Sequence, residues 1–107
     1  KRAAIARALA LEPAVLLLDE PTSGLDPATA RGIDALLRGL VDDLGLTVLA
    51  VTHDLDTLLG AVDCIVALTD GRVAAIGDAR AMLASGDPWI HDYFAARRTV
   101  AASSMDN

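Results

Sequence analysis

Apolar residues follow two different spacings along this chain, and the two spacings alternate. Short uninterrupted apolar runs, such as VLLL at 15–18, are typical of strands buried on both faces of a sheet. Longer stretches repeat their apolar residues every three or four positions, which is typical of helices with one buried face. The pattern predicts strands over 15–18, 46–51, 64–68 and 72–76, and helices over 1–12, 27–44, 55–61, 78–85 and 88–97.

Residues with special backbone preferences mark the ends of these elements. Pro13 ends the first, Ala-rich helix, and Asp26 with Pro27 begins the next one as an N-cap followed by a proline in the first turn. Gly45 ends that helix. An Asp-Gly pair at 70–71 separates two apolar runs and predicts a hairpin turn. Strands that alternate with helices imply parallel pairing with right-handed crossovers, so the predicted class is α/β, with a hairpin and helices at its C-terminal end.

The composition is that of a globular domain with an aliphatic core. The 107 residues are 53% hydrophobic but only 3% aromatic, so Leu, Val, Ile and Ala must fill the core. The formal net charge of -6 argues against nonspecific nucleic-acid binding, which needs a basic surface. Cys64 is the single cysteine; it excludes an internal disulfide and, within an apolar run, is expected to be a buried structural thiol. No apolar run approaches the roughly 18 to 20 residues that a membrane-spanning helix needs.

Polar side chains directly follow the first two predicted strands. Asp19 and Glu20 come after 15–18, and Thr52 and His53 come after 46–51. Ligands of parallel α/β sheets bind beyond the carboxyl ends of the strands, so we expect these side chains at the edge of a site. One carboxylate of such a pair can hold Mg²⁺, directly or through water, while the other orients or deprotonates a water molecule. By residue type alone, Asp19 and Glu20 can equally be solvated residues that begin a loop.

Three motifs, in order along the chain, carry a resemblance to a known family. VLLLDEPTSGLDP at 15–27 resembles the Walker B strand, catalytic glutamate and D-loop of ABC-type ATPases. AVTHD at 50–54 resembles the switch-histidine motif of that family, and RAAIARALALEP at 2–13 resembles the helix that follows its signature sequence. The resemblance extends to about Gly77 and implies a partial P-loop NTPase (RecA-like) core of the ABC ATPase type.

The resemblance implies ATP and Mg²⁺ as cofactors and assigns roles to individual residues. Asp19 would hold the Mg²⁺ of MgATP through water, and Glu20 would polarise the water that attacks the γ-phosphate. His53 would hydrogen-bond the γ-phosphate and sense its loss. Four residues match the D-loop, which in the family communicates across a head-to-tail pair of ATPase domains: Ser23, Gly24, Leu25 and Asp26.

Several of these residues also have a purely structural interpretation. Asp26 is expected to be the N-cap of its helix whether or not it also acts in a D-loop. A single histidine is usually structural or solvated, so the role of His53 depends on the Thr-His-Asp context. His91 has no such context and is predicted to be a surface residue. Asp42 and Asp43 are most simply the solvated end of a helix.

Two motifs that bind ATP in this family do not occur in the sequence. There is no Gly-x-x-x-x-Gly-Lys-Ser/Thr to hold the phosphates and no Leu-Ser-Gly-Gly signature. We therefore expect residues 1–97 to be the C-terminal part of one ABC ATPase domain, with 98–107 as a disordered tail. The complete protein would be an ATP hydrolase, whereas the isolated 107 residues are predicted neither to bind ATP tightly nor to hydrolyse it.

The C-terminal segment points to a subgroup of transporters. DPWIHDYFAARR at 87–98 resembles the end of Mla-type ATPases, which serve phospholipid transport and organic-solvent resistance at the Gram-negative envelope. The resemblance implies a cytoplasmic subunit, peripheral on the inner membrane, with a second ATPase subunit and transmembrane permease subunits as partners. The same segment can also be an amphipathic helix that packs Trp89, Tyr93 and Phe94 onto the domain. The alternatives are an ABC ATPase for another solute, and a truncated, non-catalytic remnant or interaction module.

Overall fold

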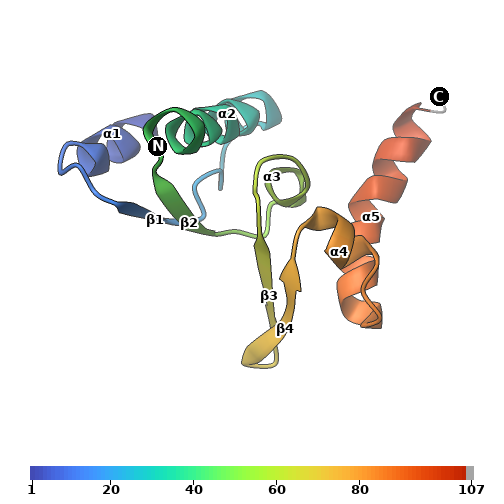
Figure 1. The fold of residues 1–107 in the computed structure, drawn as a ribbon. Coiled ribbons are helices and arrows are strands. Elements are labelled where there is room, and N and C mark those ends of the chain that lie inside the picture. The colour runs from blue at the N-terminus through green and yellow to red at the C-terminus, as the bar shows by residue number, and fades with distance from the viewer. Residues whose placement is uncertain (106–107) are drawn as a thin grey trace. The chain divides into compact units, whose positions relative to one another are not determined.

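The computed structural model describes the backbone of residues 1–105 and the side chains of residues 1–96. It consists of two compact units, one over Lys1–Thr57 and the other from Leu58 onward. The elements in chain order (Figure 1) are α1 (Arg2–Leu9), β1 (Val15–Asp19), α2 (Pro27–Leu44), β2 (Thr47–Val51), α3 (Leu55–Gly60), β3 (Ile65–Thr69), β4 (Arg72–Gly77), α4 (Ala79–Leu83) and α5 (Pro88–Met105).

The first unit is a parallel pair of strands with α1 and α2 on the same face (Figure 1). β1 and β2 pair in register from Val15 opposite Thr47 to Asp19 opposite Val51, and α2 is the crossover between them. This arrangement confirms the predicted α/β class with parallel strands. The core is aliphatic, as the composition predicts, and its buried members are Ile5, Leu16, Ile33, Leu37 and Leu46.

Helix α2 begins and ends where the sequence predicts. The carboxylate of Asp26 accepts hydrogen bonds from the backbone N–H of Thr29 at 3.1 Å and from its hydroxyl at 2.5 Å. These bonds confirm Asp26 as the N-cap of α2, and they also lower the pKa of its carboxylate. At the other end, Gly45 adopts a left-handed conformation (φ +67°), which glycine reaches without the steric cost of a side chain.

The second face of the strand pair is exposed, so the prediction of strands buried on both faces is wrong. Leu17, Leu49 and Val51 are 69%, 60% and 64% exposed. Side chains alternate along a strand, so those of Leu16 and Leu18 reach the helices while that of Leu17 points away from them. Within Lys1–Thr57 the helices form only one layer, and an apolar run therefore has only one covered face.

The second unit is an antiparallel hairpin followed by two helices. β3 and β4 pair from Ile65 opposite Gly77 to Thr69 opposite Arg72, with an irregularity in the register after Ala67. The predicted turn at 70–71 is confirmed, because both of its residues have positive φ, at 53° and 73°. A two-residue hairpin turn of type I′ requires this conformation.

Helices α4 and α5 close this unit around Met82, Ile90 and Phe94, each 2% exposed or less. Helix α4 approaches β4 closely, because a Cβ atom placed on Gly77 would lie 2.7 Å from the Cβ of Ala81. The prediction that α5 packs one apolar face onto the domain is thus confirmed for Phe94. The ring of Trp89 instead stacks on that of Tyr93, with centroids 5.4 Å apart, and remains 51% exposed.

Two predictions in this unit differ from the structure. Cys64 is exposed rather than buried, because it lies just before β3 and outside the strand pairing. Helix α5 continues past Arg97 to Met105, since the Ala-rich segment after Pro88 contains no further proline or glycine to end it. The disorder predicted for residues 98–107 stays a prediction. Residues 106–107 lie outside the part of the chain that the structure describes.

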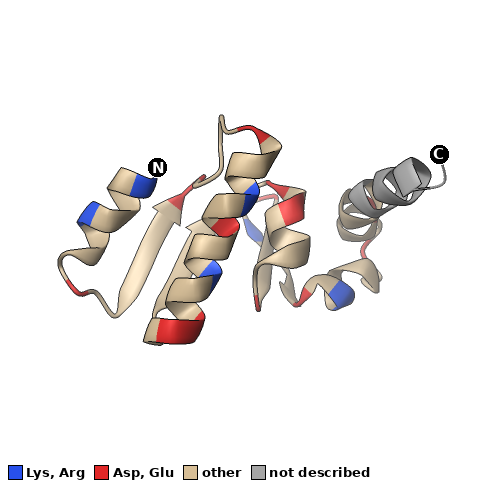
Figure 2. Cartoon of the chain, turned by 90° about the horizontal axis from the view of Figure 1, so that it is seen from above, with Lys and Arg blue, Asp and Glu red and all other residues tan. Residues whose placement is uncertain are grey.

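Charged residues alternate in sign along α2, as Figure 2 shows. The pair Arg38–Asp42, one helical turn apart, has a closest distance of 2.7 Å, and the side chain of Asp42 is 58% exposed, in agreement with a solvated helix end. His91 is at the surface as predicted, with its Nδ1 at 3.1 Å from Asp92 Oδ1. No helix within residues 1–105 is both long enough and apolar enough to cross a bilayer.

Candidate functional site

The carboxyl ends of β1 and β2 bring Glu20 and His53 together. The two strands are adjacent and parallel, and the N–H of Glu20 extends the ladder by donating to the Val51 carbonyl at 2.7 Å. Glu20 Oε1 lies 2.8 Å from His53 Nδ1. The side chain of His53 is 79% exposed and that of Glu20 is 34% exposed, so both can reach a ligand outside the sheet. The structure thus joins two residues that are 33 positions apart in the sequence.

The backbone of Glu20 has an uncommon conformation for a residue with a side chain. Its φ is +49°, in the left-handed region. Three hydrogen bonds hold it there: its N–H donates to Val51, and its carbonyl accepts from the Ser23 N–H at 3.1 Å and from Lys1 Nζ at 3.2 Å. Backbone strain of this kind concentrates at functional sites, where the surrounding structure maintains it.

The Glu20–His53 contact defines which atoms can act on a ligand. An ionised carboxylate only accepts hydrogen bonds, so Nδ1 of His53 must be the donor in this pair. That bond orients the imidazole ring and thereby sets the direction of its second nitrogen, Nε2. The second carboxylate oxygen of Glu20 can accept a hydrogen bond from water. The pair can therefore orient a water molecule and hold a polar group beside it.

Asp19 stands next to this pair, at the last position of β1. Its side chain is exposed and lies on the same strand face as Val15 and Leu17. Among the described residues, no cluster of three or more His, Cys, Asp or Glu could hold a metal ion by itself. A single carboxylate fits Mg²⁺, which usually takes one or two carboxylates and completes its shell with water and phosphate oxygens.

The residues that match the D-loop connect β1 to α2. Ser23 and Gly24 are exposed, and Gly24 has φ +76°, so the loop turns sharply there. The side chain of Leu25 packs partly buried against the core, and Asp26 caps α2. The structure therefore gives Leu25 and Asp26 structural contacts of their own, while contact with a second ATPase domain stays a prediction.

The structure also joins five polar residues that the sequence did not single out for a site. The Asp54 carboxylate accepts hydrogen bonds from the Thr22 hydroxyl at 2.8 Å and from Arg31 Nη2 at 2.6 Å. Arg31 Nε also lies 3.2 Å from Asp34, which accepts a bond from the hydroxyl of Thr57 at 2.9 Å. We call these five residues the Asp54 network. One signal for it was available: a charged Asp34 stands beside Ile33 on the apolar side of α2.

Burial and hydrogen bonding act in opposite directions on the carboxylates of the Asp54 network. Burial raises the pKa of Asp54, but the hydrogen bonds from Arg31 and Thr22 outweigh it and lower that pKa to about 2. For Asp34 the effect of burial is larger than that of the Thr57 bond and of Arg31, so its pKa is raised. The pair Arg31–Asp54 therefore remains ionised at neutral pH.

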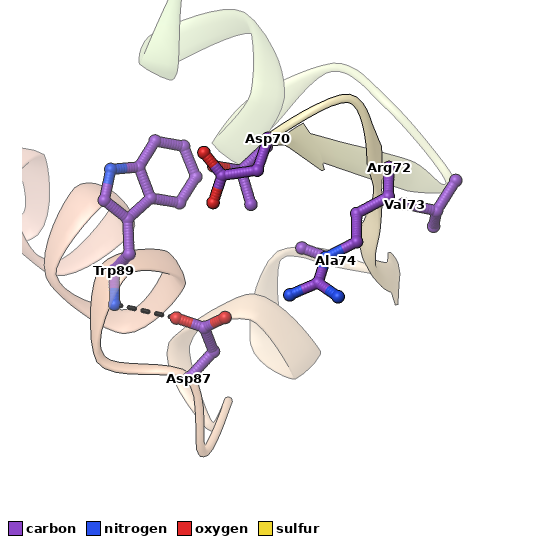
Figure 3. Close-up of a pocket in the computed structure, with 7 residues that line it drawn as sticks. Asp70, Arg72, Val73, Ala74, Asp87 and Trp89 are labelled. Atoms are coloured by element: carbon purple, nitrogen blue, oxygen red, sulfur yellow. Dashed lines mark hydrogen bonds between the residues drawn. The ribbon is translucent and has the colours of Figure 1, made fainter.

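An open pocket lies in the second unit, between the hairpin tip and the start of α5 (Figure 3). The Trp89 ring and the Asp70, Arg72 and Asp87 side chains line it, and Asp87 accepts a hydrogen bond from the backbone N–H of Trp89 at 2.9 Å. None of the residues that the sequence motifs predicted for a site lines this pocket.

Solved structures of ATP-binding cassettes match this fold. CbiO1 from Clostridium perfringens, part of the ABC transporter complex cbiONQ, superposes with a TM-score of 0.68 at 35% identity, over 84% of this chain and 40% of that one. A dimeric cassette in a post-hydrolysis state with ADP and Pi gives a TM-score of 0.66 at 42% identity, over 72% of this chain and 33% of that one. The fold is therefore that of part of an ABC ATPase cassette.

Curated relatives identify the same class of protein by sequence. The methionine import ATP-binding protein MetN 1 of Rhodococcus jostii is 53% identical over 72% of this chain and 23% of its own length. MetN of Nocardia farcinica is 39% identical over 98% of this chain and 28% of its own length. No family model matches. The chain spans about a quarter of these relatives, and it is homologous to part of the ATP-binding subunits of ABC transporters.

Proposed function

We propose that this chain is part of the ATPase subunit of an ABC transporter and that Glu20 and His53 act together in ATP hydrolysis. The observation that carries the proposal is the 2.8 Å contact between Glu20 Oε1 and His53 Nδ1 at the ends of adjacent parallel strands. The homology to ATP-binding cassettes indicates that the ligand of such a pair would be ATP.

In this proposal Glu20 orients the attacking water and accepts its proton, while His53 holds the ligand through Nε2. Phosphoryl transfer needs little covalent chemistry from a protein and depends on positioning and on stabilising charge. The Glu20–His53 bond contributes the positioning, because it sets the direction of the imidazole. The left-handed backbone of Glu20, with its three hydrogen bonds, sets the position of the carboxylate.

Asp19 is the residue that would hold Mg²⁺ in this site. Its exposed carboxylate is at the last position of β1 and directly precedes Glu20, so the residue that would hold the ion is next in the chain to the residue that would orient the water. When bound with ATP, Mg²⁺ would neutralise charge on the phosphate oxygens. The chain itself contributes one oxygen ligand and leaves the rest of the shell to water and phosphate.

We further propose that the transported solute is a small molecule of the amino-acid class rather than a phospholipid. The relatives described above are named as methionine importers, which supports the alternative of another solute. The phospholipid interpretation rests only on the short segment 87–98, which resembles Mla-type ATPases. The proposed partners are permease subunits and a second ATPase subunit, the latter contacted in part through Ser23 and Gly24. This proposal is supported by the solved cassettes, of which one is part of an ABC transporter complex and another is dimeric. The proposed location is the cytoplasmic face of the membrane.

The test of catalysis is Glu20→Gln in the full-length polypeptide that carries this sequence, assembled with its transporter. We expect kcat for ATP hydrolysis to fall by about 10² to 10⁴-fold while ATP remains bound, because the amide cannot accept a proton. Asp43→Asn, the same chemical change at the solvated end of α2, is the matched control and should keep wild-type turnover. Unchanged turnover in Glu20→Gln would refute the role of Glu20.

The test of the solute is stimulation of ATPase activity in the reconstituted transporter. A methionine-class amino acid should raise ATP turnover, and phospholipid added to the same vesicles should not. Stimulation by phospholipid alone would restore the Mla-type interpretation, and no ATP-dependent activity of any kind would favour the non-catalytic module.

A further inference from the structure

We propose that the Asp54 network positions the side chain of His53 relative to that of Glu20. Thr22 links the network to the loop that carries Glu20. The inference rests on the proposed function, because the network acts through the Glu20–His53 pair. None of its five members has to contact a ligand for this role.

The carboxylate of Asp54 lies where three segments of the first unit meet. Oδ2 accepts bonds from Thr22 Oγ1 at 2.8 Å and from Arg31 Nη2 at 2.6 Å. Oδ1 accepts from the backbone N–H groups of Asp56 and Thr57 at 3.0 and 3.3 Å. The donors therefore come from the loop after β1, from α2 and from the first turn of α3. One side chain ties these three segments together.

The segments that Asp54 joins are the ones that carry the two members of the pair. Thr22 is two residues after Glu20, and Asp54 follows His53 directly. The hydroxyl of Thr52, on the other side of His53, accepts the Asp54 N–H at 3.0 Å, so the backbone around His53 is held on both sides. The Thr22–Asp54 bond is thus a second link between the two loops, beside the Glu20–His53 contact itself.

Three of the five members of the network are buried. Thr22, Asp34 and Thr57 are 6%, 8% and 5% exposed. The Asp34 carboxylate forms an ion pair with Arg31 at 3.2 Å from Nε and accepts the Thr57 hydroxyl at 2.9 Å, so α2 carries both the guanidinium that binds Asp54 and a carboxylate beside it. The planar fork of an arginine gives this contact a defined direction that a lysine does not reproduce.

Capping of α3 does not account for the whole arrangement. An N-cap needs only the contacts from Asp54 to the N–H groups of Asp56 and Thr57. The Thr22 hydroxyl adds nothing to that cap but connects it to the loop of Glu20. Misplacement of a reacting group by about 1 Å can cost about 10²-fold in rate, so a bond that aligns two loops has a catalytic consequence.

The test compares Thr22→Val with Thr22→Ser in the full-length ATPase, with steady-state ATP hydrolysis as the measurement. Valine keeps the shape of threonine and removes the hydroxyl, whereas serine keeps the hydroxyl. We expect Thr22→Val to lower kcat by about 10 to 100-fold with KM for ATP changed less than threefold. Thr22→Ser should restore most of kcat. Thr47→Val, an exposed threonine of β2 outside the network, is the matched control.

A double variant separates positioning from loss of fold. In the Glu20→Gln background there is no base to align, so adding Thr22→Val should lower the residual kcat by less than about twofold. Equal losses in both backgrounds, or a loss that appears only in KM or in the melting temperature, would overturn the positioning role. Should Thr22→Val not fold, Arg31→Lys carries the same test, with Arg38→Lys on the same helix as its control.

The outcomes for this inference and for the proposed function are distinguishable. Wild-type turnover in Glu20→Gln refutes the catalytic assignment, and the positioning inference falls with it. Impaired turnover in Glu20→Gln together with wild-type kcat in Thr22→Val refutes the positioning inference alone.

Discussion

At two residues of this protein, Glu20 and Asp54, an unfavourable effect is offset by hydrogen bonds. The backbone of Glu20 carries a strain of about 1 to 3 kcal/mol because of its positive φ, and three hydrogen bonds hold it in place. The carboxylate of Asp54 is partly buried, which disfavours its charge, yet its hydrogen bonds favour the charge more strongly. The surrounding hydrogen bonds therefore decide the backbone conformation of Glu20 and the ionisation of Asp54, and residue type alone does not.

The pKa of Asp54 predicts a dependence of stability on pH. It is lowered from 3.8 to about 2, below the value in the unfolded chain, so ionisation of this group stabilises the fold. That contribution is fully present above pH about 4 and is lost as the pH falls through about 2. We expect it to be about 1 to 2 kcal/mol, since the side chain is still 26% exposed.

Denaturant unfolding of the wild type and of Asp54→Asn at several pH values between 7 and 2 measures this contribution. The difference in the free energy of unfolding should be largest at neutral pH and should narrow toward pH 2. A difference that stays constant over this range would show that ionisation of Asp54 does not stabilise the fold.

Helix α2 and the β3–β4 hairpin follow local signals at their ends, whereas α1 ends at Leu9, before Pro13, and α5 continues past Arg97. Tertiary contacts decide which face of an element is buried. Asp26 and Gly45 bound α2 as the sequence indicates, and the turn at 70–71 has the backbone that a two-residue hairpin needs. The burial of strand faces does not follow from local signals, because β1 and β2 have only one covered face although their sequences are apolar on both faces. In the second unit, the contact between α4 and β4 requires a residue without a side chain at position 77.

Because α4 and β4 are in close contact at Gly77, adding one methyl group there is predicted to lower the stability of the second unit. In Gly77→Ala the new Cβ would lie 2.7 Å from that of Ala81, so α4 would have to shift away from β4. We expect a loss of about 1 to 3 kcal/mol in the free energy of unfolding of this unit. Thermal or denaturant unfolding measures it, with Gly86→Ala as the control, since a Cβ there meets nothing within 4 Å. Equal stability of the two variants would contradict the close packing.

The whole molecule contains a pair of candidate catalytic residues without the motifs that bind phosphate in its family. Glu20 and His53 are in contact, whereas the sequence has neither a phosphate loop nor a Leu-Ser-Gly-Gly signature. The curated relatives described above are longer, and the chain matches them over about a quarter of their length. A pair that orients water needs a bound nucleotide beside it, so catalysis is expected to require more than these 107 residues.

This requirement gives a prediction for the isolated polypeptide. The 107 residues alone should show no tight binding of ATP, because a phosphate loop supplies most of the donors to the phosphates. Titration calorimetry with MgATP measures binding, and phosphate release measures hydrolysis. The full-length polypeptide is the positive control for both, and micromolar binding to the isolated chain would show that other residues hold the phosphates.

The sequence by itself determined the order of elements, the cap of α2, the hairpin turn and the three motifs that indicate an ABC ATPase. These features depend on residues at most a few positions apart, so spacing and residue type are enough to predict them. Only the tertiary structure decided that one strand face stays exposed, that Cys64 is not buried, and that Thr22, Arg31 and Asp54 meet. The Thr22–Asp54 bond joins residues 32 positions apart and the Arg31–Asp54 bond residues 23 apart. Such contacts arise from how β1, α2 and β2 pack, and no local pattern in the chain encodes them.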